Sequence, residues 1–196
     1  MAHTSPLLTF DDLRDRVVSC QLCPLSETRT NVVFGEGDPD ADVLLVGEGP
    51  GEVEDRTGRP FVGPAGKKLD EVLQSVDIKR EDIFVGNVVK CRPPGNRVPT
   101  KQEMEACMPF LEAQIALINP SLVITLGNTS TQWLMPDIPT ITKSHGTFYT
   151  WRGEIRLFPM FHPSYLLRNP SKAKGSPKYL TWLDIQKVRE WMDNHA

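Results

Sequence analysis

Long apolar runs are missing from this chain of 196 residues, which is 39% hydrophobic. No apolar run reaches about eighteen residues, the length that a membrane crossing needs, so no membrane-spanning helix and no membrane partner are expected. The opening MAHTSPLLTFDD has neither a basic stretch nor a long apolar one, so no signal peptide is expected. These absences predict a soluble, cytoplasmic protein.

The chain also lacks an excess of positive charge and is poor in cysteine. Its formal net charge of -3 argues against a histone-like coat but leaves room for a local basic patch. In a reducing compartment the four cysteines are poor candidates for disulfides, so we read them as packing residues or metal ligands. Internal repeats and low-complexity tracts are missing too, and the length predicts one domain over residues 1–196.

Short buried strands and amphipathic helices alternate along the chain. Apolar, β-rich runs predict core strands at residues 42–47, 82–91 and 121–127, with a fourth near 161 after a hairpin at Arg152 and Gly153. Helical patterns occupy residues 67–76, 100–118 with a bend at Pro109, 128–134, and the stretch after Ser176. Residues 48–66 are expected to form one long loop. The alternation predicts an α/β fold, a three-layer α/β/α sandwich around a four-stranded, mostly parallel sheet.

Polar groups follow three of the predicted strands at their carboxyl ends. The loops in question begin at Gly47, near Asn87 and at His162. Ligands of open parallel sheets bind in the crevice beyond these ends. The pattern therefore predicts a ligand site where these three loops meet.

The four cysteines have an uneven spacing. Cys20 and Cys23 form a C-x2-C pair, whereas Cys91 and Cys107 stand apart. A zinc ribbon normally shows a second close pair, while an iron–sulfur cluster needs only that its thiolates converge in space. The alternative is that Cys91 and Cys107 are buried packing residues, which leaves the C-x2-C pair unexplained. A cluster here would be mainly structural, joining the N-terminal segment to the loop after the second strand.

Three segments occur in one order together with these cysteines: GEGPGEVEDRTGRPFVG (47–63), NVVKCRPPGNR (87–97) and HPSYLLR (162–168). They closely resemble the family 4 uracil-DNA glycosylases, and the resemblance spans roughly residues 14 to 190. It implies a [4Fe-4S] cluster on Cys20, Cys23, Cys91 and Cys107. It also implies base excision repair, in which uracil is flipped out of DNA and its N-glycosidic bond is hydrolysed, leaving an abasic site.

The same resemblance implies the partner and the state of the protein. The partner would be uracil-containing DNA, single- or double-stranded, and the protein would act as a monomer. In a prokaryote it would associate with the nucleoid.

The resemblance assigns the binding roles as well. Gly47, Glu48 and Gly49 would line the uracil pocket, and Phe61 would stack on the flipped base. Stacking contributes about 1–3 kcal/mol per base but does not choose among bases. The Asn87 amide would choose, because it can accept from uracil N3–H and donate to O4, whereas cytosine presents the reverse pattern. Taken alone, Asn87 is equally typical of a strand-end cap.

Catalytic roles follow from the same motifs. His162 would donate a hydrogen bond to uracil O2 as negative charge builds on the base, an effect worth roughly 3–4 kcal/mol per donor. A lone histidine before proline is otherwise more often structural. Glu48 is the candidate for holding the attacking water or stabilising the sugar cation, with Glu54 and Asp55 as competitors. Glu54 is also a candidate for excluding the methyl group of thymine; the alternative for both residues is a solvated acidic loop.

Two features of the last motif concern DNA contact. Leu166 would be the wedge that fills the gap left by the flipped nucleotide, and the alternative is a buried loop leucine. Basic side chains around this motif are candidates for phosphate contacts, or else a generic solvated face: Arg152, Arg156, Arg168, Lys172, Lys174 and Lys178.

Other classes of protein are compatible with parts of the pattern. An iron–sulfur redox protein with a flavodoxin-like sheet would need a phosphate-binding loop, and GEGPGEVED lacks the G-x-G-x-x-G order. An inactive accessory protein of the same fold would bind uracil-containing DNA but release no base. A related class that bonds covalently to DNA carries a histidine-bearing insertion after the third cysteine. Residues 92–100 contain no histidine, which predicts turnover.

Overall fold

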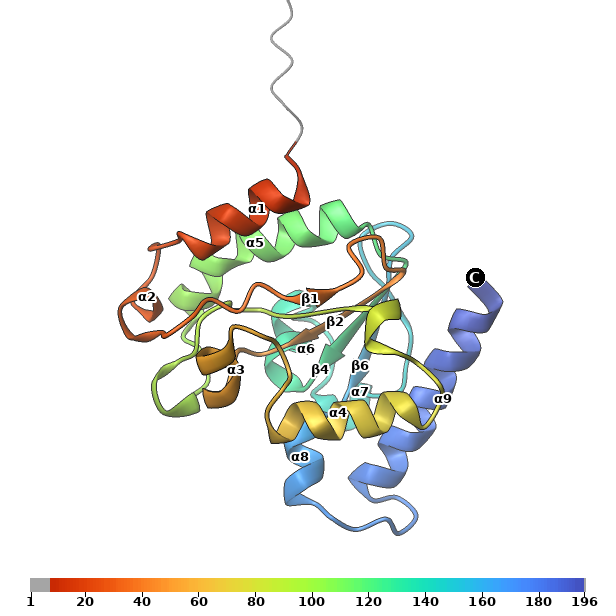
Figure 1. Ribbon diagram of the computed structural model, residues 1–196. Coiled ribbons are helices and arrows are strands. Elements are labelled where there is room, and N and C mark those ends of the chain that lie inside the picture. Colours follow the sequence, from red (N-terminus) through yellow and green to blue (C-terminus); the bar gives the residue numbers. More distant parts are fainter. Residues whose placement is uncertain (1–7, 196) are drawn as a thin grey trace, which may run out of the picture.

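A single sheet forms the centre of the molecule in the computed structural model, which describes residues 8–195 (Figure 1). Four parallel strands make up its core in the order β3-β2-β4-β6. Their bounds are Phe84–Asn87, Val43–Gly47, Leu122–Leu126 and Arg156–Met160. The predicted four-strand parallel core is therefore confirmed.

The sheet of the described residues has six strands rather than four. β1 (Glu36–Gly37) pairs antiparallel with β3, and β5 (Tyr149–Thr150) pairs antiparallel with β6. The hairpin that was expected before the last core strand is β5 with β6. Two-residue strands have no side-chain period to detect, which is why the sequence predicted too few strands.

Helices cover both faces of the sheet, as a three-layer sandwich requires. Successive strand residues alternate between two apolar clusters, so Leu44 and Val46 face one layer while Val43 and Leu45 face the other. The first layer is built from α1 (Phe10–Val18), α5 (Lys101–Ile118) and α6 (Asn128–Leu134). The second is built from α4 (Pro64–Gln74) and α9 (Pro177–His195). Figure 1 shows α1 lying alongside α5, with α4 and α9 across the sheet from them.

The helix boundaries agree with the sequence where capping signals were present. Thr100 and Glu103 form the expected capping box at the start of α5, which continues through Pro109. Residues 48–66 were wrongly expected to form one loop, because α3 (Glu52–Thr57) lies within them. This short helix ends at Gly58, whose φ of 72° is in the left-handed region that glycine adopts freely. The other short helices are α2 (Leu25–Thr28), α7 (Ile141–Ser144), α8 (Pro163–Arg168) and the 3-10 turns η1 (Arg80–Asp82) and η2 (Pro94–Asn96).

Membrane insertion was not expected, and within residues 8–195 we find no helix with the length and apolar character to cross a bilayer. The expectation about a signal peptide falls mainly on residues 1–7. Those residues lie outside the part of the chain that the structure describes.

Candidate active site

The carboxyl ends of the core strands bring three of the predicted residues into contact. Gly47 at the end of β2 is the register partner of Asn87 at the end of β3. A Cβ atom on Gly47 would lie 2.5 Å from Asn87 Oδ1 and 2.5 Å from Phe61 Cζ. No side chain fits between the amide and the aromatic ring, so glycine is required at this position. Gly47, Phe61 and Asn87 thus share one site, although their roles toward uracil stay predictions.

Asn87 is the most informative residue of this site. Its side chain is 1% exposed, and Oδ1 is the one buried side-chain polar atom in the described chain without a hydrogen-bond partner. A buried acceptor left unpaired costs about 1–3 kcal/mol, so native proteins seldom retain one without a reason. Its side-chain oxygen accepts from no backbone N–H, which removes the alternative of a strand-end cap. The geometry calls for a donor from a ligand.

Phe61 has an unusual backbone conformation. Its φ is 51°, in the left-handed region, and its side chain is 6% exposed. A bulky residue held there costs on the order of 1–3 kcal/mol, and such strain concentrates at functional sites. The first turn of α4 packs closely on this residue, because a Cβ on Gly66 would lie 1.8 Å from the Phe61 carbonyl oxygen.

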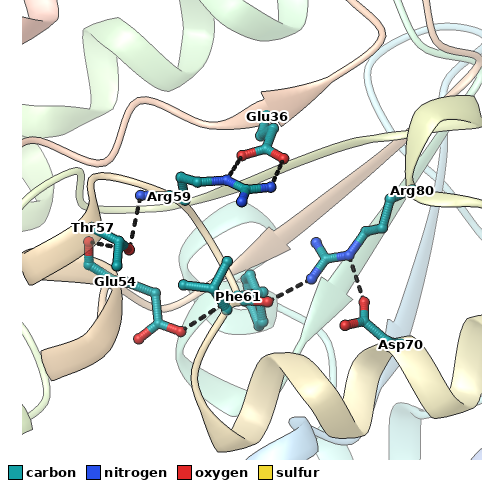
Figure 2. A network of polar contacts seen from close by, with 8 residues as sticks. Glu36, Glu54, Thr57, Arg59, Phe61, Asp70 and Arg80 are labelled. Atoms are coloured by element: carbon teal, nitrogen blue, oxygen red, sulfur yellow. Dashed lines mark hydrogen bonds and ion pairs between the residues drawn. The ribbon is translucent and has the colours of Figure 1, made fainter.

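Polar contacts hold the loop that carries Phe61 (Figure 2). The backbone N–H groups of Val62 and Gly63 donate to Glu54 Oε1 at 2.9 and 2.7 Å. On the opposite side, the Arg80 guanidinium donates from Nη2 to the Phe61 carbonyl oxygen at 2.6 Å. The ring is therefore presented by a backbone that is fixed on both sides.

The structure gives Glu54 and Asp55 structural roles that the sequence did not predict. Glu54 is 8% exposed and Asp55 is 5% exposed, so the alternative of a solvated acidic loop is wrong for both. Asp55 Oδ1 accepts from the backbone N–H groups of Thr30 at 2.9 Å and Asn31 at 3.4 Å. Both carboxylates therefore cap backbone amides through one oxygen each, and a role of either toward a catalytic water stays a prediction.

His162 caps the N-terminus of α8, close to the Phe61 ring. The two ring centroids are 6.0 Å apart. The Ser164 backbone N–H donates to His162 Nδ1 at 3.1 Å, so Nδ1 is an acceptor and the ring proton resides on Nε2. Ser164 Oγ also lies 2.7 Å from Nδ1. This arrangement leaves an Nε2–H donor for a ligand.

The charge state of His162 fits a donor role. Its pKa is lowered to about 4, mainly by burial and in smaller part by Arg168, while Glu54 acts in the opposite direction. The imidazole is therefore neutral at neutral pH. A neutral imidazole with Nε2–H can donate a hydrogen bond to a developing anion without first taking up a proton.

Glu48 and Gly49 continue the loop from β2. Glu48 is half-buried, and its Oε2 accepts a 2.5 Å hydrogen bond from the Thr129 hydroxyl at the start of α6. A Cβ on Gly49 would lie 2.8 Å from Val89 Cγ2, so the loop after β3 packs directly against this position. This contact leaves little room for a side chain at position 49, and Glu48 is the carboxylate of this loop segment.

The structure corrects the expectation for Leu166. This side chain is 1% exposed in α8, which packs against α4, so it belongs to the core and matches the alternative of a buried leucine. The next residue, Leu167, is 42% exposed. A wedge must be free to enter DNA, and in this motif Leu167 is the leucine with that freedom.

Basic side chains at the end of α8 and after it belong to a stretch of the chain with one charge sign. Residues 155–183 contain no aspartate or glutamate, although acidic residues outnumber basic ones in the chain as a whole. No ion pair within the described residues involves Arg168, Lys172, Lys174 or Lys178. Arg152, in contrast, pairs with Glu112 and is less suited to phosphate contact.

The four cysteines lie at the corner where α1, α2, α5 and the end of β3 meet. All four are free thiols, and Cys23, Cys91 and Cys107 pack in one apolar cluster. Burial raises the pKa of Cys107 to about 11 and also raises that of Cys91, to which nearby Cys20 and Cys23 add. Cys91 therefore lies close enough to Cys20 and Cys23 to interact with them electrostatically. A bound metal would be needed to hold the Cys91 and Cys107 sulfurs as thiolates.

Donors surround these sulfurs. Arg29 Nη1 donates to Cys91 Sγ at 3.3 Å, and the Lys90 backbone N–H donates to Cys107 Sγ at 3.3 Å. Hydrogen bonds of this kind stabilise thiolates that ligate iron–sulfur clusters. Within residues 8–195, no group of three or more His, Cys, Asp or Glu is arranged to hold a metal ion. The assignment of a cluster to the four cysteines is therefore a proposal.

Three residues of the site had been missed. Thr129, Ser164 and Arg80 contact Glu48, His162 and the Phe61 backbone respectively. Ser164 lies two residues after His162, a spacing that could have suggested the contact. Thr129 and Arg80 are distant in sequence from their partners and carry no local signal.

Comparison with known proteins agrees with this fold and site. A family model described as the uracil DNA glycosylase superfamily matches residues 34–186, and the chain belongs to that superfamily. A type-4 uracil-DNA glycosylase of Thermotoga maritima is 48% identical over 91% of this chain and 92% of its own length. Type-4 enzymes of Sulfurisphaera tokodaii and Saccharolobus solfataricus are 42% and 43% identical, covering 93% and 92% of this chain and 84% and 85% of their own lengths. Within the superfamily, the chain is thus a member of the type-4 family.

Proposed function

We propose that this protein is a uracil-DNA glycosylase, a hydrolase of DNA base excision repair that releases free uracil and leaves an abasic site. The observation that carries the proposal is the unpaired, buried Oδ1 of Asn87, held beside the Phe61 ring at the ends of β2 and β3. The N3–H of uracil is the donor that this oxygen lacks. The names of the type-4 relatives support the same substrate.

Recognition requires that the base leave the stack. A uracil in the DNA helix would be flipped into the pocket, stacked on Phe61 and read by the Asn87 amide at N3–H and O4. Gly47 leaves the space for this contact, and Glu48 and Gly49 form the adjoining wall. Cytosine would place a donor against the amide donor and leave two buried groups unpaired, which costs about 1–3 kcal/mol for each.

Cleavage of the N-glycosidic bond would use the neutral His162 side chain as a hydrogen-bond donor. As the N1–C1′ bond breaks, its electron pair moves onto the base, and the His162 Nε2–H stabilises the charge that builds on O2. A water molecule then adds to C1′ of the cation-like sugar. Glu48, oriented by Thr129, would hold this water and accept its proton.

The four cysteines would hold a [4Fe-4S] cluster. When bound, the cluster would cross-link α1, α2, α5 and the end of β3, a structural contribution rather than a step of the reaction. Cys91 lies four residues after Asn87, so the cluster would also steady the segment that reads the base.

DNA would approach the side of the molecule that carries α8. The basic stretch after α8 would contact phosphates. We propose Leu167 in place of Leu166 as the wedge that fills the gap of the flipped nucleotide. We further propose that the enzyme acts as a monomer on single- and double-stranded DNA, which in a prokaryote lies in the nucleoid.

The role of Glu54 in excluding thymine is a second, separate proposal. Its carboxylate is committed to the Val62 and Gly63 amides, so a Glu54→Ala variant is expected chiefly to lose uracil release. Release of thymine from a T·G duplex by that variant would support steric exclusion of the methyl group. Its absence would count against this role.

The test of function uses an oligonucleotide with one uracil, followed by alkali cleavage of abasic sites. The wild type should cut at the uracil, His162→Ala should lose about 100- to 1000-fold in kcat, and Glu48→Ala should also lose activity. Binding without cleavage by the wild type would favour an inactive DNA-binding accessory protein. Equal cleavage by all three proteins would preserve the activity but overturn the assigned mechanism.

A further inference from the structure

Arg80 lies outside the three sequence motifs, and it contacts the backbone of Phe61. It begins the 3-10 turn η1, just before β3, and its guanidinium reaches the Phe61 carbonyl oxygen with Nη2 at 2.6 Å. Its Nε donates to Asp70 Oδ1 in α4 at 2.7 Å. Figure 2 shows Arg80 between Asp70 and the backbone of Phe61.

The peptide unit between Phe61 and Val62 is held at both polar ends. Its carbonyl oxygen accepts from Arg80, and its N–H donates to Glu54 Oε1 at 2.9 Å. A rotation of this peptide would break both hydrogen bonds. Because Phe61 has a φ of 51°, its backbone would otherwise tend to relax toward a more common conformation.

The orientation of the ring depends on this peptide. Phe61 Cζ lies so close to Gly47 that a Cβ added to this glycine would collide with it. A small rotation of the backbone would therefore tilt the surface on which a flipped base is stacked. The hydrogen bond from Arg80 is charge-assisted, the stronger class, and it acts on the strained residue itself.

We propose that Arg80 is a positioning residue for uracil excision, which fixes the Phe61–Val62 peptide so that the aromatic ring is ready for the base. The proposal rests on the function proposed above. Asp70 orients the guanidinium and supports the same role one step further from the base.

Arg59 supplies a matched control two residues before Phe61. Its guanidinium also forms two hydrogen bonds, but both go to Glu36 at 2.8 and 2.6 Å and neither reaches the Phe61 peptide. Figure 2 shows both arginines in the polar contacts around Phe61, Arg59 bound to Glu36 and Arg80 bound to Asp70 and Phe61. Replacing each by methionine removes the charge and keeps an apolar stem of similar length.

The experiment measures uracil release and its inhibition by free uracil. Arg80→Met should raise the inhibition constant of free uracil about tenfold, as expected for loss of one charge-assisted hydrogen bond, and should lower kcat/KM in parallel. Arg80→Lys, which retains a donor, should recover part of the loss. Arg59→Met should stay within about twofold of wild type, because exposed ion pairs contribute little.

A double variant separates positioning from general damage. If Arg80 acts through the ring, Arg80→Met should cost little further activity in a Phe61→Ala background, because coupled residues are non-additive. The proposal would be overturned if the losses of the two single variants multiplied in the double variant. Equal effects of Arg80→Met and Arg59→Met would also overturn it. Should Arg80→Met fail to fold, Asp70→Asn is the second variant, and it should show a smaller loss in the same direction. An inactive wild type would refute the proposed function itself, whereas an active wild type with an unaffected Arg80→Met refutes only the role of Arg80.

Discussion

Two buried amide side chains, Asn87 and Gln114, differ in whether their polar atoms have hydrogen-bond partners. Gln114 in α5 is 1% exposed and fully engaged, because its oxygen accepts from Lys90 Nζ at 2.5 Å and its nitrogen donates to the Phe34 carbonyl at 2.9 Å. Asn87 is equally buried, yet its oxygen has no partner. Complete hydrogen bonding marks a structural amide, and an unpaired atom at the ends of parallel strands marks a place kept for a ligand.

Lys90 extends the comparison, because it touches both regions. Its side chain is fully buried, and burial lowers its pKa to about 8. Its Nζ donates to the Asn87 carbonyl oxygen at 2.9 Å as well as to Gln114. Lys90 thus links the backbone at the end of β3 to Gln114 in α5, while the side-chain oxygen of Asn87 is left free.

Among the variants of this comparison, Asn87→Ala should have the largest effect on activity. Asn87→Ala should lower kcat/KM for uracil release by about 10- to 100-fold, since up to two hydrogen bonds to the base are lost. Its melting temperature should not fall, because the removed oxygen had no partner. Gln114→Ala should instead destabilise the fold by about 1–3 kcal/mol, because Lys90 loses an acceptor. Kinetics and thermal unfolding of both variants test this, and matching profiles would end the distinction between the two amides.

A smaller effect on activity is expected from the two adjacent leucines of α8. Leu167→Ala should reduce uracil release from duplex DNA about tenfold with unchanged stability, because the gap in the helix is no longer filled. Single-stranded substrate, which has no such gap, should be affected less. Leu166→Ala should lower the free energy of unfolding by roughly 2–5 kcal/mol as a buried side chain is removed. Loss of duplex activity in Leu166→Ala without loss of stability would restore Leu166 as the wedge.

The smallest effect concerns pH. Because the pKa of His162 is lowered to about 4, kcat should be level from neutral pH down to about pH 5 and should fall only as the imidazole becomes protonated. An inflection of kcat near pH 6.5, absent in His162→Asn, would show that the protonated form matters and would contradict the neutral donor.

The stability of the fold should also depend on pH through this histidine. In the unfolded chain His162 takes up a proton near pH 6.5, whereas in the folded chain it does so only near pH 4. The unfolded state therefore binds more protons between these values, and stability falls by up to roughly 3 kcal/mol as pH is lowered through that window. Denaturant unfolding at several pH values, compared with His162→Asn, measures this difference.

Much of the architecture could be predicted from local pattern. Val43–Gly47 and Leu122–Leu126 are short runs of mainly apolar residues, so they were found as core strands. Thr100 with Glu103 located the start of α5. The convergence of Gly47, Asn87 and His162 followed from the rule for strand ends. The strand β1 and the helix α3 were missed because they are too short to show a period, and β5 was expected only as the first arm of a hairpin.

The finer features of the site depend on contacts that a linear pattern does not contain. Leu166 and Leu167 are identical in type and adjacent, and only the rotation of α8 against α4 decides which is buried. The left-handed φ of Phe61 and the bond from Arg80, nineteen positions along the chain, arise from tertiary packing. The burial of Glu54 likewise depends on the turn at Val62 and Gly63, which an acidic loop sequence does not reveal.

The two short edge strands of the sheet affect the tendency of the protein to aggregate. Each rim of the sheet, β1 on one side and β5 on the other, is only two residues long and runs against its neighbour. A long rim would offer a row of free N–H and C=O groups onto which a neighbouring molecule could add a strand and begin a fibre. Edge strands this short expose few such groups, so they disfavour edge-to-edge association between the sheets of neighbouring molecules.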